Sequence, residues 1–451
     1  MALRHLAYKY RIRPTDEQQA LLVKTFGCCR YLYNRYVEWN NNAYKEWVSC
    51  GRKKGEYAKI PVESVFKAED AFLREVDATA LMNVRRHFSQ SVQNFIKSCT
   101  GKRKGRKAKA PTFHKKGKCR DSFTSSIVNG NIRLDGNLLR LPKLGDVEVI
   151  MHRELPCGAR ILSVTVSMER DGSLYASMLF ETEMMEQQCR ARVKPLAEHR
   201  VIGLDMSLSD FYVSSDKEAH TRTKYVRNYR KAEKSLKRLN RQHSRRMLFA
   251  TGEYVFSKRW NKDVEKKNPS KNREKARLRM ARQYRKIANR RLDFVCQEAS
   301  RLSKAYDVIV IEDIDMQAMA RSLHLGKSAN DLGFGLFKQR LEWACQKNGC
   351  LLVKADRWFA SSKTCNECGA RNEALKLSDR EWVCPSCGRF LDRDFNAASN
   401  LRDWYLTHYN TAGTAEIYAC GDSINTFGQR PNANAVIETG KSISDDGSPS
   451  L

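Results

Sequence analysis

The chain has 451 residues, with 82 Lys and Arg against 51 Asp and Glu, a formal net charge of +31 at pH 7 and a pI near 9.7. This length exceeds what one hydrophobic core usually supports, so we expect two to four domains. No apolar run approaches the roughly 18 residues of a membrane span, and no signal-peptide core follows Met1. The composition argues against a membrane or secreted protein, and it predicts a cytosolic protein with a polyanionic partner, nucleic acid before any other.

The N-terminal pattern predicts one strand followed by a helical subdomain. Apolar and charged residues alternate over residues 3–12, and Pro14 ends this strand. Thr15 and Gln18 have the spacing of a capping box, which predicts the start of a helix. Two stripes at steps of three and four predict helices between residues 15 and 100: Leu22, Phe26, Cys29, Tyr33 and Tyr36, then Val84, Phe88, Val92 and Phe95.

Residues 101–110, GKRKGRKAKA, form a basic loop punctuated by glycine, and short strand-like runs separated by turn signals follow it over residues 112–183. Several short strands in succession predict a small barrel or sandwich. We expect the N-terminal strand to join this β domain. The helical subdomain would then be an insertion into it.

After Pro195 the pattern changes to that of an α/β domain. Short apolar runs at residues 201–204, 211–214, 308–311 and 351–354 predict buried strands. From Arg402 onward the periodicity weakens and the chain ends in SISDDGSPSL, so we expect a partly disordered tail.

Residues 222–290 are the most basic stretch, with 25 Lys or Arg and 5 Asp or Glu, a net charge of +20. Narrow apolar seams on both sides of a loop predict a helical hairpin. A solvated coiled coil usually mixes charges of both signs, whereas this cation excess repels itself unless a polyanion neutralises it. We therefore interpret the hairpin as a nucleic-acid surface.

Two Cys-x-x-Cys pairs, Cys365 with Cys368 and Cys384 with Cys387, stand fifteen residues apart. Each pair can place two thiolates on one ion, and together they complete a closed tetrahedral Zn²⁺ shell. Unrelated buried cysteines or a redox pair would be the alternative. A closed site of four thiolates is structural, because it leaves no open position for catalysis.

Three acidic residues are each tied to a buried element: Asp205 follows VIGL, Glu312 follows DVIVI, and Asp394 opens a helix-like segment. Carboxylates that converge at strand ends can bind two Mg²⁺ ions about 4 Å apart, which is the chemistry of RNase H-fold nucleases. Any one of them alone could instead cap a turn or a helix. Asp392 competes with Asp394 for the third position, and Asp210, Asp313 and Asp315 are weaker candidates.

These motifs, in order, resemble the TnpB family, the transposon-encoded relatives of type V CRISPR effectors. The resemblance lies in VIGLDMSLSDFYV, VIVIEDIDMQAM, DLGFGLFKQRLEW, KADRWFASSKTCNECG, LSDREWVCPSCG and LDRDFNAASNL, and more weakly in the N-terminal half, so that it covers residues 5–402. It implies that Asp205, Glu312 and Asp394 hold Mg²⁺ and that the four cysteines hold Zn²⁺. It also favours Asp394 over Asp392, because the second Asp of the DRD tripeptide is the family's ligand.

The resemblance implies a multidomain α/β and β-barrel architecture built around a RuvC-like, RNase H-fold nuclease. The expected parts are the first strand of a wedge β-barrel (1–14), a helical recognition domain (15–110), the rest of the wedge barrel (111–190), the nuclease domain (191–360) with its basic hairpin (222–305), a zinc ribbon (361–390), a last RuvC segment (391–405) and a disordered tail (406–451).

It also implies an RNA-guided DNA endonuclease of prokaryotic type. Such a protein carries a transposon-derived guide RNA, recognises a short motif beside a double-stranded DNA target, and cuts in a single RuvC site. One or two copies could assemble on one RNA. A repressor that binds RNA and DNA without cutting, and an RNase H-fold DNA transposase, are the alternative hypotheses.

Overall fold

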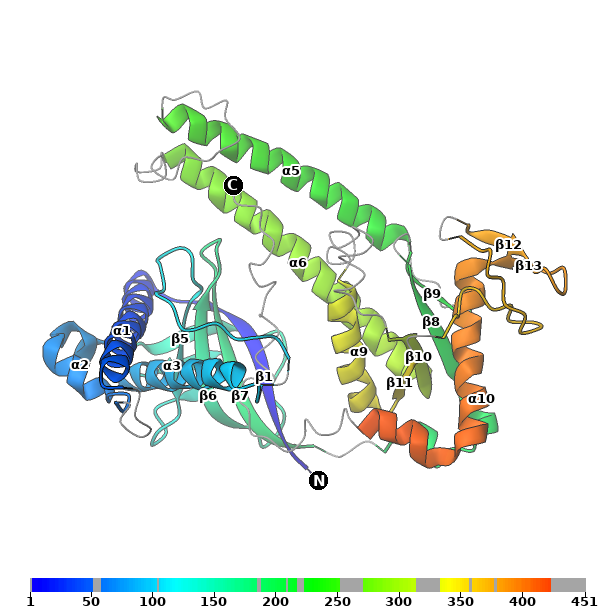
Figure 1. Ribbon diagram of the computed structural model, residues 1–451. Helices are drawn as coiled ribbons and strands as arrows, with labels where there is room; N and C mark the ends of the chain where they lie inside the picture. The colour runs from blue at the N-terminus through cyan, green and yellow to red at the C-terminus, as the bar shows by residue number, and fades with distance from the viewer. Residues whose placement is uncertain are drawn as a thin grey trace. The chain divides into compact units, whose positions relative to one another are not determined.

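The computed structural model describes residues 2–51, 58–103, 105–184, 188–207, 210–216, 223–251, 271–313, 333–356, 359–376 and 379–422. Two compact units divide the chain, residues 1–185 and residues 186–431 (Figure 1). Among the helices in these ranges, none is both long and apolar enough for a bilayer crossing.

The first unit contains an antiparallel sheet in the order β2-β6-β7-β1-β5-β4-β3. The N-terminal strand β1 lies between β7 and β5, which confirms that it joins the β domain. Within the described residues the order has two edges, β2 and β3, so backbone pairing leaves this sheet open where a closed barrel was expected. The strands are β1 (Ala2–Arg13), β2 (Asp121–Ser126), β3 (Arg133–Asp135), β4 (Leu138–Leu141), β5 (Gly145–Ile150), β6 (Arg160–Met168) and β7 (Leu174–Met184).

The helices of this unit are inserted between β1 and β2, as expected. Thr15 and Gln18 form the predicted capping box at the start of α1, and the Asp77 carboxylate caps α3. Both apolar stripes face the sheet and share one core with it, because a helix at this spacing buries one face. The helices are α1 (Asp16–Ser49), α2 (Glu63–Glu69), the 3-10 helix η1 (Ala71–Glu75) and α3 (Ala78–Cys99).

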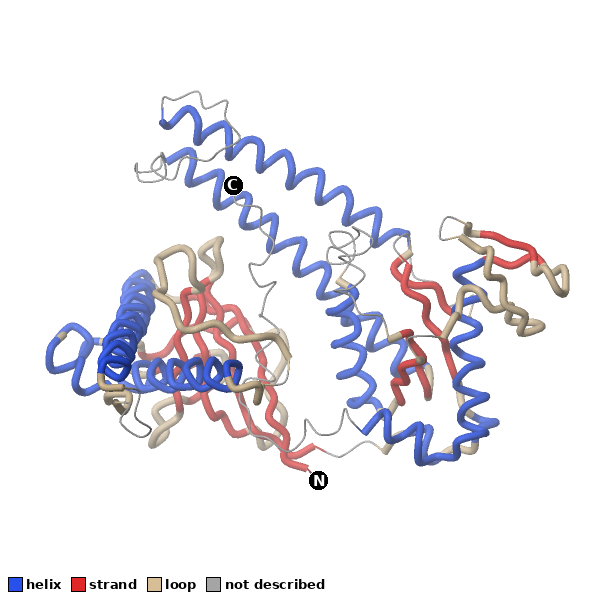
Figure 2. Tube along the Cα trace, in the orientation of Figure 1, coloured by secondary structure: helices blue, strands red, loops and turns tan. Residues whose placement is uncertain are grey.

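The second unit contains a sheet in the order β11-β10-β8-β9, in which β8, β10 and β11 are parallel and β9 is antiparallel. Both faces are covered: α6 and α9 lie on one face and α10 on the other (Figures 1 and 2). This explains the continuous apolar runs that marked the strands in the sequence. The strands are β8 (Val201–Ser207), β9 (Phe211–Ser214), β10 (Val308–Glu312) and β11 (Leu351–Ala355). The helices that connect or cover them are α4 (Arg190–Val193), η2 (Leu196–Glu198), α9 (Phe334–Asn348) and α10 (Arg393–Asp422).

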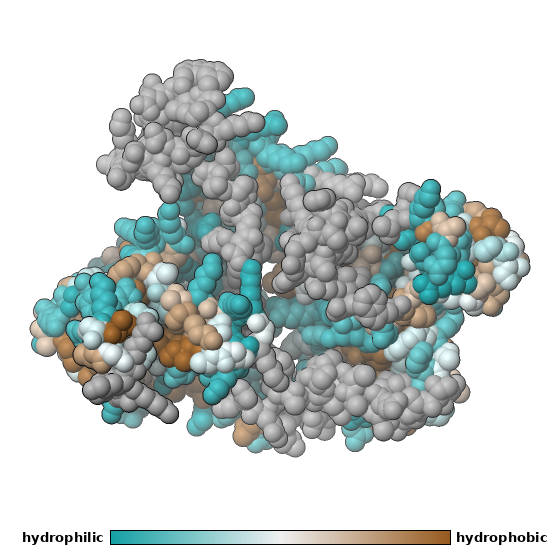
Figure 3. Space-filling view, viewed as in Figure 1, coloured by the Kyte–Doolittle hydropathy of each residue, from teal (hydrophilic) through white to brown (hydrophobic). Residues whose placement is uncertain are grey.

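The basic stretch forms two long helices, α5 (Thr223–Thr251) and α6 (Lys271–Ala305), which contact each other as the predicted hairpin. Gln283 donates a hydrogen bond from Nε2 to the Ala232 carbonyl across the pair, at 3.4 Å. The expected seam lies there, since Ala232 and Ile287 are buried. Hydrophilic side chains cover the visible outer surface of these helices (Figure 3).

The prediction of a disordered tail from Arg402 or residue 406 is wrong over its first part. Helix α10 continues to Asp422, far past the expected end of the last RuvC segment. Leu401 and Tyr405 are fully buried against Val308, Val310 and Val353 of the sheet, and burying this apolar surface stabilises the helix where its periodicity is weak. Residues 423–451 lie outside the described residues.

Candidate functional site: a carboxylate cluster beside a four-cysteine knuckle

The four predicted cysteines come together. Their sulfur atoms all lie within 4.8 Å of one another, and among the described residues they are the one such group of possible metal ligands. They lie around a small hairpin of β12 (Glu381–Val383) and β13 (Phe390–Asp392), with Trp382 and Leu375 in its core.

The spacing of the sulfur atoms fits a tetrahedral zinc ion. Cys365 and Cys387 have their Sγ atoms 3.7 Å apart, and Cys368 and Cys384 have theirs 3.6 Å apart. A Zn–S bond of about 2.3 Å in a regular tetrahedron predicts sulfurs about 3.8 Å apart, whereas a disulfide would need about 2 Å. Hydrogen bonds from the Cys387 backbone, and then from Ser386 and the neighbouring sulfurs, lower the pKa of Cys384 to about 6. The hydrogen bond from the Arg389 backbone lowers the pKa of Cys387, but hydrogen bonds with the other sulfurs outweigh it and raise that pKa to about 12. Without a metal ion the group thus holds a thiolate at Cys384 and a proton at Cys387.

Buried asparagines attach this knuckle to α10. Asn396 donates from Nδ2 to the Thr364 carbonyl at 2.7 Å and accepts from the Asn366 backbone at 2.9 Å. One turn later, Asn400 donates to the carbonyls of Ser361 and Thr364 at 2.7 and 2.6 Å. The Asn-Ala-Ala-Ser-Asn segment therefore fixes the first cysteine turn to the helix that carries Asp394 in its first turn, a role that sequence reasoning missed.

Asp205 and Glu312 lie on neighbouring parallel strands. The last β8–β10 pair in register is Leu204 with Ile311, so Asp205 and Glu312 come one residue later on each strand. Side chains alternate along a strand, which places both carboxylates on the same face as Gly203 and Val310, the face that α10 covers.

One premise about Asp205 was wrong. We expected it to end its strand, but β8 continues to Ser207, because Asp205 and the next two residues pair with β9, with Asp205 opposite Val213. Glu312 does end β10, as predicted. An antiparallel partner at the end of a strand is a tertiary feature that a local apolar run cannot reveal.

Asp394 lies in the first turn of α10 and approaches the same edge of the sheet. A Cβ atom added to Gly203 would lie 2.0 Å from the Ala398 carbonyl oxygen, so the backbones of β8 and α10 touch one turn after Asp394. Asp392, the competing candidate, is exposed and accepts a hydrogen bond from the Phe395 backbone at 2.7 Å, as a helix cap does. The geometry thus gives the two aspartates different surroundings.

The weaker candidates have other surroundings where the structure describes them. Asp313 is 2.9 Å from Lys338 Nζ, in an ion pair. Asp210 lies in the turn between β8 and β9. Asp315 lies outside the described residues.

The charges of Asp394 and Glu312 raise the proton affinity of Asp205. Burial, followed by the charges of Asp394 and Glu312, raises the pKa of Asp205 to about 8, although Arg393 and Arg380 oppose the shift. Burial also raises the pKa of Glu312. Arg380 Nη1 contacts both carboxylate oxygens of Asp394, at 3.2 and 2.9 Å. Asp205 and Glu312 offer the hard oxygen donors that suit Mg²⁺, and Asp394, which is paired with Arg380, is a third such donor.

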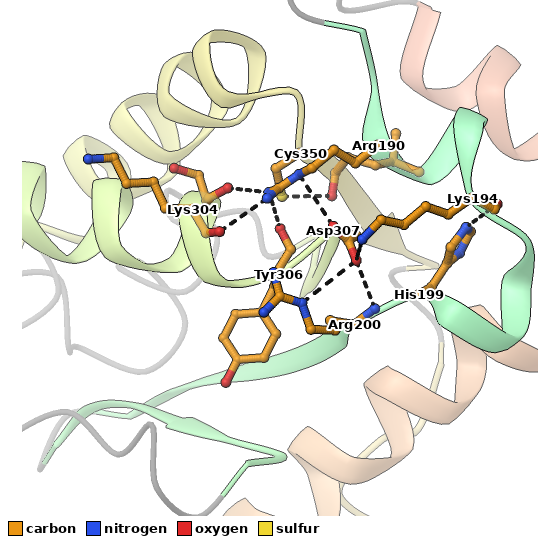
Figure 4. Close-up of polar contacts among 10 residues, drawn as sticks. Arg190, Lys194, His199, Arg200, Lys304, Tyr306, Asp307 and Cys350 are labelled. Carbon is orange, nitrogen blue, oxygen red and sulfur yellow. Dashed lines mark hydrogen bonds and ion pairs between the residues drawn. The ribbon is translucent and has the colours of Figure 1, made fainter.

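A second buried acid, Asp307, was missing from the sequence predictions. It is fully buried where the chain enters β10, and it contacts Lys194 Nζ at 3.0 Å, Arg190 Nε at 3.3 Å and the Arg200 backbone N–H at 3.1 Å (Figure 4). Burial alone would raise the pKa of Asp307, but the Arg200 and Lys194 hydrogen bonds outweigh it and hold that pKa below its usual value. The Arg190 guanidinium also donates to the carbonyls of Ser303, Lys304 and Tyr306. This network ties the segment entering the second unit to the far end of its central strand, away from Glu312.

Three family models match the chain. Residues 180–323 match one described as a probable transposase, and residues 334–401 match a Cas12f1-like TNB domain. Residues 1–47 match one described as a helix-turn-helix domain, although here they form strand β1 and helix α1.

The chain is also similar to named relatives and aligns with a solved structure. A protein of Streptomyces pristinaespiralis named an RNA-guided DNA endonuclease is 31% identical over 424 residues, 93% of this chain and 91% of its own. The TnpB-like protein L79 of Acanthamoeba polyphaga mimivirus is 28% identical over 149 residues, 30% of this chain and 28% of its own. A Cas12f1 complex with sgRNA and target DNA aligns with a TM-score of 0.49 and 12% identity, over 86% of this chain and 83% of that one. By the identity and coverage of the Streptomyces relative, this chain belongs to the TnpB family, the transposon-encoded RNA-guided DNA endonucleases related to type V CRISPR effectors.

Proposed function

We propose that this protein is an RNA-guided DNA endonuclease that cuts double-stranded DNA by Mg²⁺-dependent phosphodiester hydrolysis in one RuvC-like site. It binds a transposon-derived guide RNA, and the guide selects the target by base pairing beside a short motif that the protein reads. Asp205, Glu312 and Asp394 are the Mg²⁺ ligands in this proposal. The four cysteines hold a structural Zn²⁺.

One observation carries the nuclease proposal. Asp205 and Glu312 end up side by side on the α10 face of a parallel sheet, and Asp394 in α10 is close enough for its charge to raise the pKa of Asp205. Gathering carboxylates from positions 205, 312 and 394 destabilises the folded chain through repulsion and burial, and the ion pair of Asp394 with Arg380 offsets this only in part. Stabilisation by divalent ions explains why such an arrangement is retained.

Two bound Mg²⁺ ions would supply an activated water and stabilise the leaving oxygen. The protein's own part is to hold the ligands. Pairing with β10 and β9 fixes the backbone at Asp205, and Glu312 lies at the end of β10. The contact of Gly203 with Ala398 determines how close α10, which carries Asp394, lies to the sheet. Asp205 must lose its proton to bind a cation, and a nearby divalent charge favours that loss.

The assignment of parts follows the family. The first unit would serve as wedge and recognition domains that read the target-adjacent motif, and the second unit as the nuclease with its knuckle. The +20 charge of residues 222–290 supports a nucleic-acid partner for the hairpin, since counterion release from phosphates gives most of the affinity of such surfaces.

A cleavage assay tests the proposal. The full chain is purified with its co-expressed RNA and given Mg²⁺ and a plasmid library that carries the guide's target beside random sequence. We expect cuts in both strands only beside one short motif, and none with Asp205→Ala, which should still bind the target. Binding without cuts would support the repressor instead, and strand joining would support a transposase.

A further inference from the structure

Residues 101–118, which we call the basic strap, link α3 to β2 in the first unit. The strap holds nine Lys or Arg and no Asp or Glu. Every one of these cations whose side chain the structure describes is exposed. At physiological ionic strength the screening length is about 8 Å, so like charges this near in sequence repel one another.

The strap is nevertheless tied down on both sides. Near its start, the Arg103 backbone N–H donates to the Lys97 carbonyl at 3.0 Å, and the Ala108 N–H donates to Ser98 Oγ at 3.0 Å. Both acceptors belong to the last turn of α3. Two backbone N–H groups of the repulsive segment are therefore hydrogen-bonded to the end of α3.

Near its other end, His114 is fixed to α1. Asn34 forms two hydrogen bonds with the His114 backbone, accepting from its N–H at 2.7 Å and donating to its carbonyl at 3.0 Å. The His114 ring stacks on Tyr33 with ring centroids 3.9 Å apart and planes 4° apart. Lys107 and Lys109 thus lie between two attached residues, Arg103 and His114, and Lys115 and Lys116 directly follow the second.

The composition of the strap indicates contact with phosphates. Phe113, which is 51% exposed, is its one Phe, Tyr or Trp, and the ring of His114 is already stacked on Tyr33, whereas base-stacking surfaces carry several available aromatic side chains. Lysine binds phosphate as a point charge and carries no base preference of its own. A surface of this kind recognises the backbone of a nucleic acid.

We infer that the basic strap is a docking surface for the sugar-phosphate backbone of the guide RNA. The choice of RNA over target DNA rests on the proposed function, in which the guide RNA stays bound while target DNA binds and dissociates. The cations of the strap repel one another all the time, so a partner that stays bound neutralises them best. The attachments at Ser98 and Asn34 preorganise the row, so that less ordering free energy opposes binding.

The test replaces four strap lysines, Lys107→Gln, Lys109→Gln, Lys115→Gln and Lys116→Gln, in the full chain. Affinity for the RNA that copurifies with the wild type is measured over a series of KCl concentrations. The plot of log affinity against log salt concentration has a negative slope, and each lost phosphate contact makes it shallower by about 0.7 to 0.9. The slope of the glutamine variant should therefore be shallower than that of the wild type by about 3. Arginine at the same four positions is the matched control and should keep the slope.

A second variant separates a built surface from a loose cation row. Asn34→Ala removes the attachment of His114 and changes no charge. We expect weaker RNA binding at every salt concentration with an unchanged slope. An affinity equal to the wild type would show that the attachment does not serve RNA binding, and would overturn the preorganised surface.

The remaining outcomes are distinct. Thermal melting first shows that the glutamine variant is folded. If the salt dependence of its RNA affinity then equals that of the wild type, the strap does not contact RNA. If its affinity for target DNA falls instead, the partner is DNA and the inference is wrong. A wild-type complex that binds its RNA but cuts nothing contradicts the proposed nuclease and leaves the strap result valid.

Discussion

Gly203 of β8 lies against the Ala398 carbonyl of α10 so closely that a Cβ atom at position 203 would be 2.0 Å from that oxygen and 2.8 Å from the Arg402 backbone nitrogen. Real Cβ atoms do not approach backbone atoms this closely, so any other residue must push the helix from the sheet. The helix carries Asp394 and the strand carries Asp205. The glycine thus determines how near two of the proposed ligands come.

Gly203→Ala should therefore damage both stability and activity. We expect the free energy of unfolding to fall by about 2 kcal/mol or more, as for overpacking of a core, and cleavage to fall by a larger factor than stability alone explains. Denaturation by urea and a cleavage assay below the melting transition measure the two effects.

Gly27→Ala is the matched control. Gly27 lies inside helix α1 with nothing within 4 Å of an added Cβ, so alanine should be neutral or stabilise the protein by about 0.5–1 kcal/mol. Equal losses from both substitutions would contradict the contact-based explanation.

Asp205→Asn should stabilise the metal-free protein at neutral pH while abolishing cleavage. The folded-state pKa of Asp205 is about 8, above its unfolded value of about 3.9, so between these values the folded state keeps a proton that the unfolded state has released. Stability of the wild type should then fall as pH rises through this window, by about 1 kcal/mol per pH unit, and asparagine removes that loss.

Thermal melting in a chelator at several pH values measures this effect. The advantage of the variant should grow from pH 5 to 8 and shrink when Mg²⁺ is added, because the cation stabilises only the carboxylate. A variant that is less stable than the wild type at pH 8 without metal would show that Asp205 has a structural role.

Cys384→Ser should remove zinc and loosen the knuckle. Loss of one thiolate opens the tetrahedral shell, and zinc binding of this type supplies folding free energy. We expect zinc content to fall from about one ion per chain toward none, together with a lower Tm. Since Asn396 and Asn400 join the knuckle to α10, cleavage should fall as well.

Cys296→Ser is the control for that substitution. Cys296 is exposed and lies outside the four-cysteine group, so its zinc content and Tm should match the wild type. The zinc content of each variant is measured after dialysis, and its Tm is taken from melting curves. Unchanged zinc in Cys384→Ser would refute the assignment of the ligands.

Asp307→Asn should destabilise the second unit by about 1–3 kcal/mol, because Arg190 and Lys194 lose their buried counterion but remain about a third exposed. The pKa of Asp307 is held below its usual value, so its contribution is present above about pH 4 and is lost as pH falls through the folded-state pKa. Urea denaturation at neutral pH should show the loss, and the difference between the variant and the wild type should narrow in acid. A constant difference at all pH values would mean that shape, not charge, makes Asp307 important.

The sequence alone predicted the secondary structure and the knuckle well. Strand and helix periods depend on local backbone geometry, so the runs at residues 201–204 and 308–311, the capping box at Thr15 and the two stripes in α1 and α3 were all found where expected. The cysteine spacing worked for the same reason, because each Cys-x-x-Cys turn is local and only two had to meet.

Tertiary structure decided what depends on distant partners. Asp205 lies inside β8 because β9 pairs with it, Asp392 caps a helix while Asp394 pairs with Arg380, and α10 continues past Arg402 where Leu401 and Tyr405 are buried on the sheet. Asp307 and Gly203 gave no local signal at all, since their importance comes from chain segments about a hundred to two hundred residues away. A local pattern fixes which face a side chain takes, but only packing decides what lies opposite it.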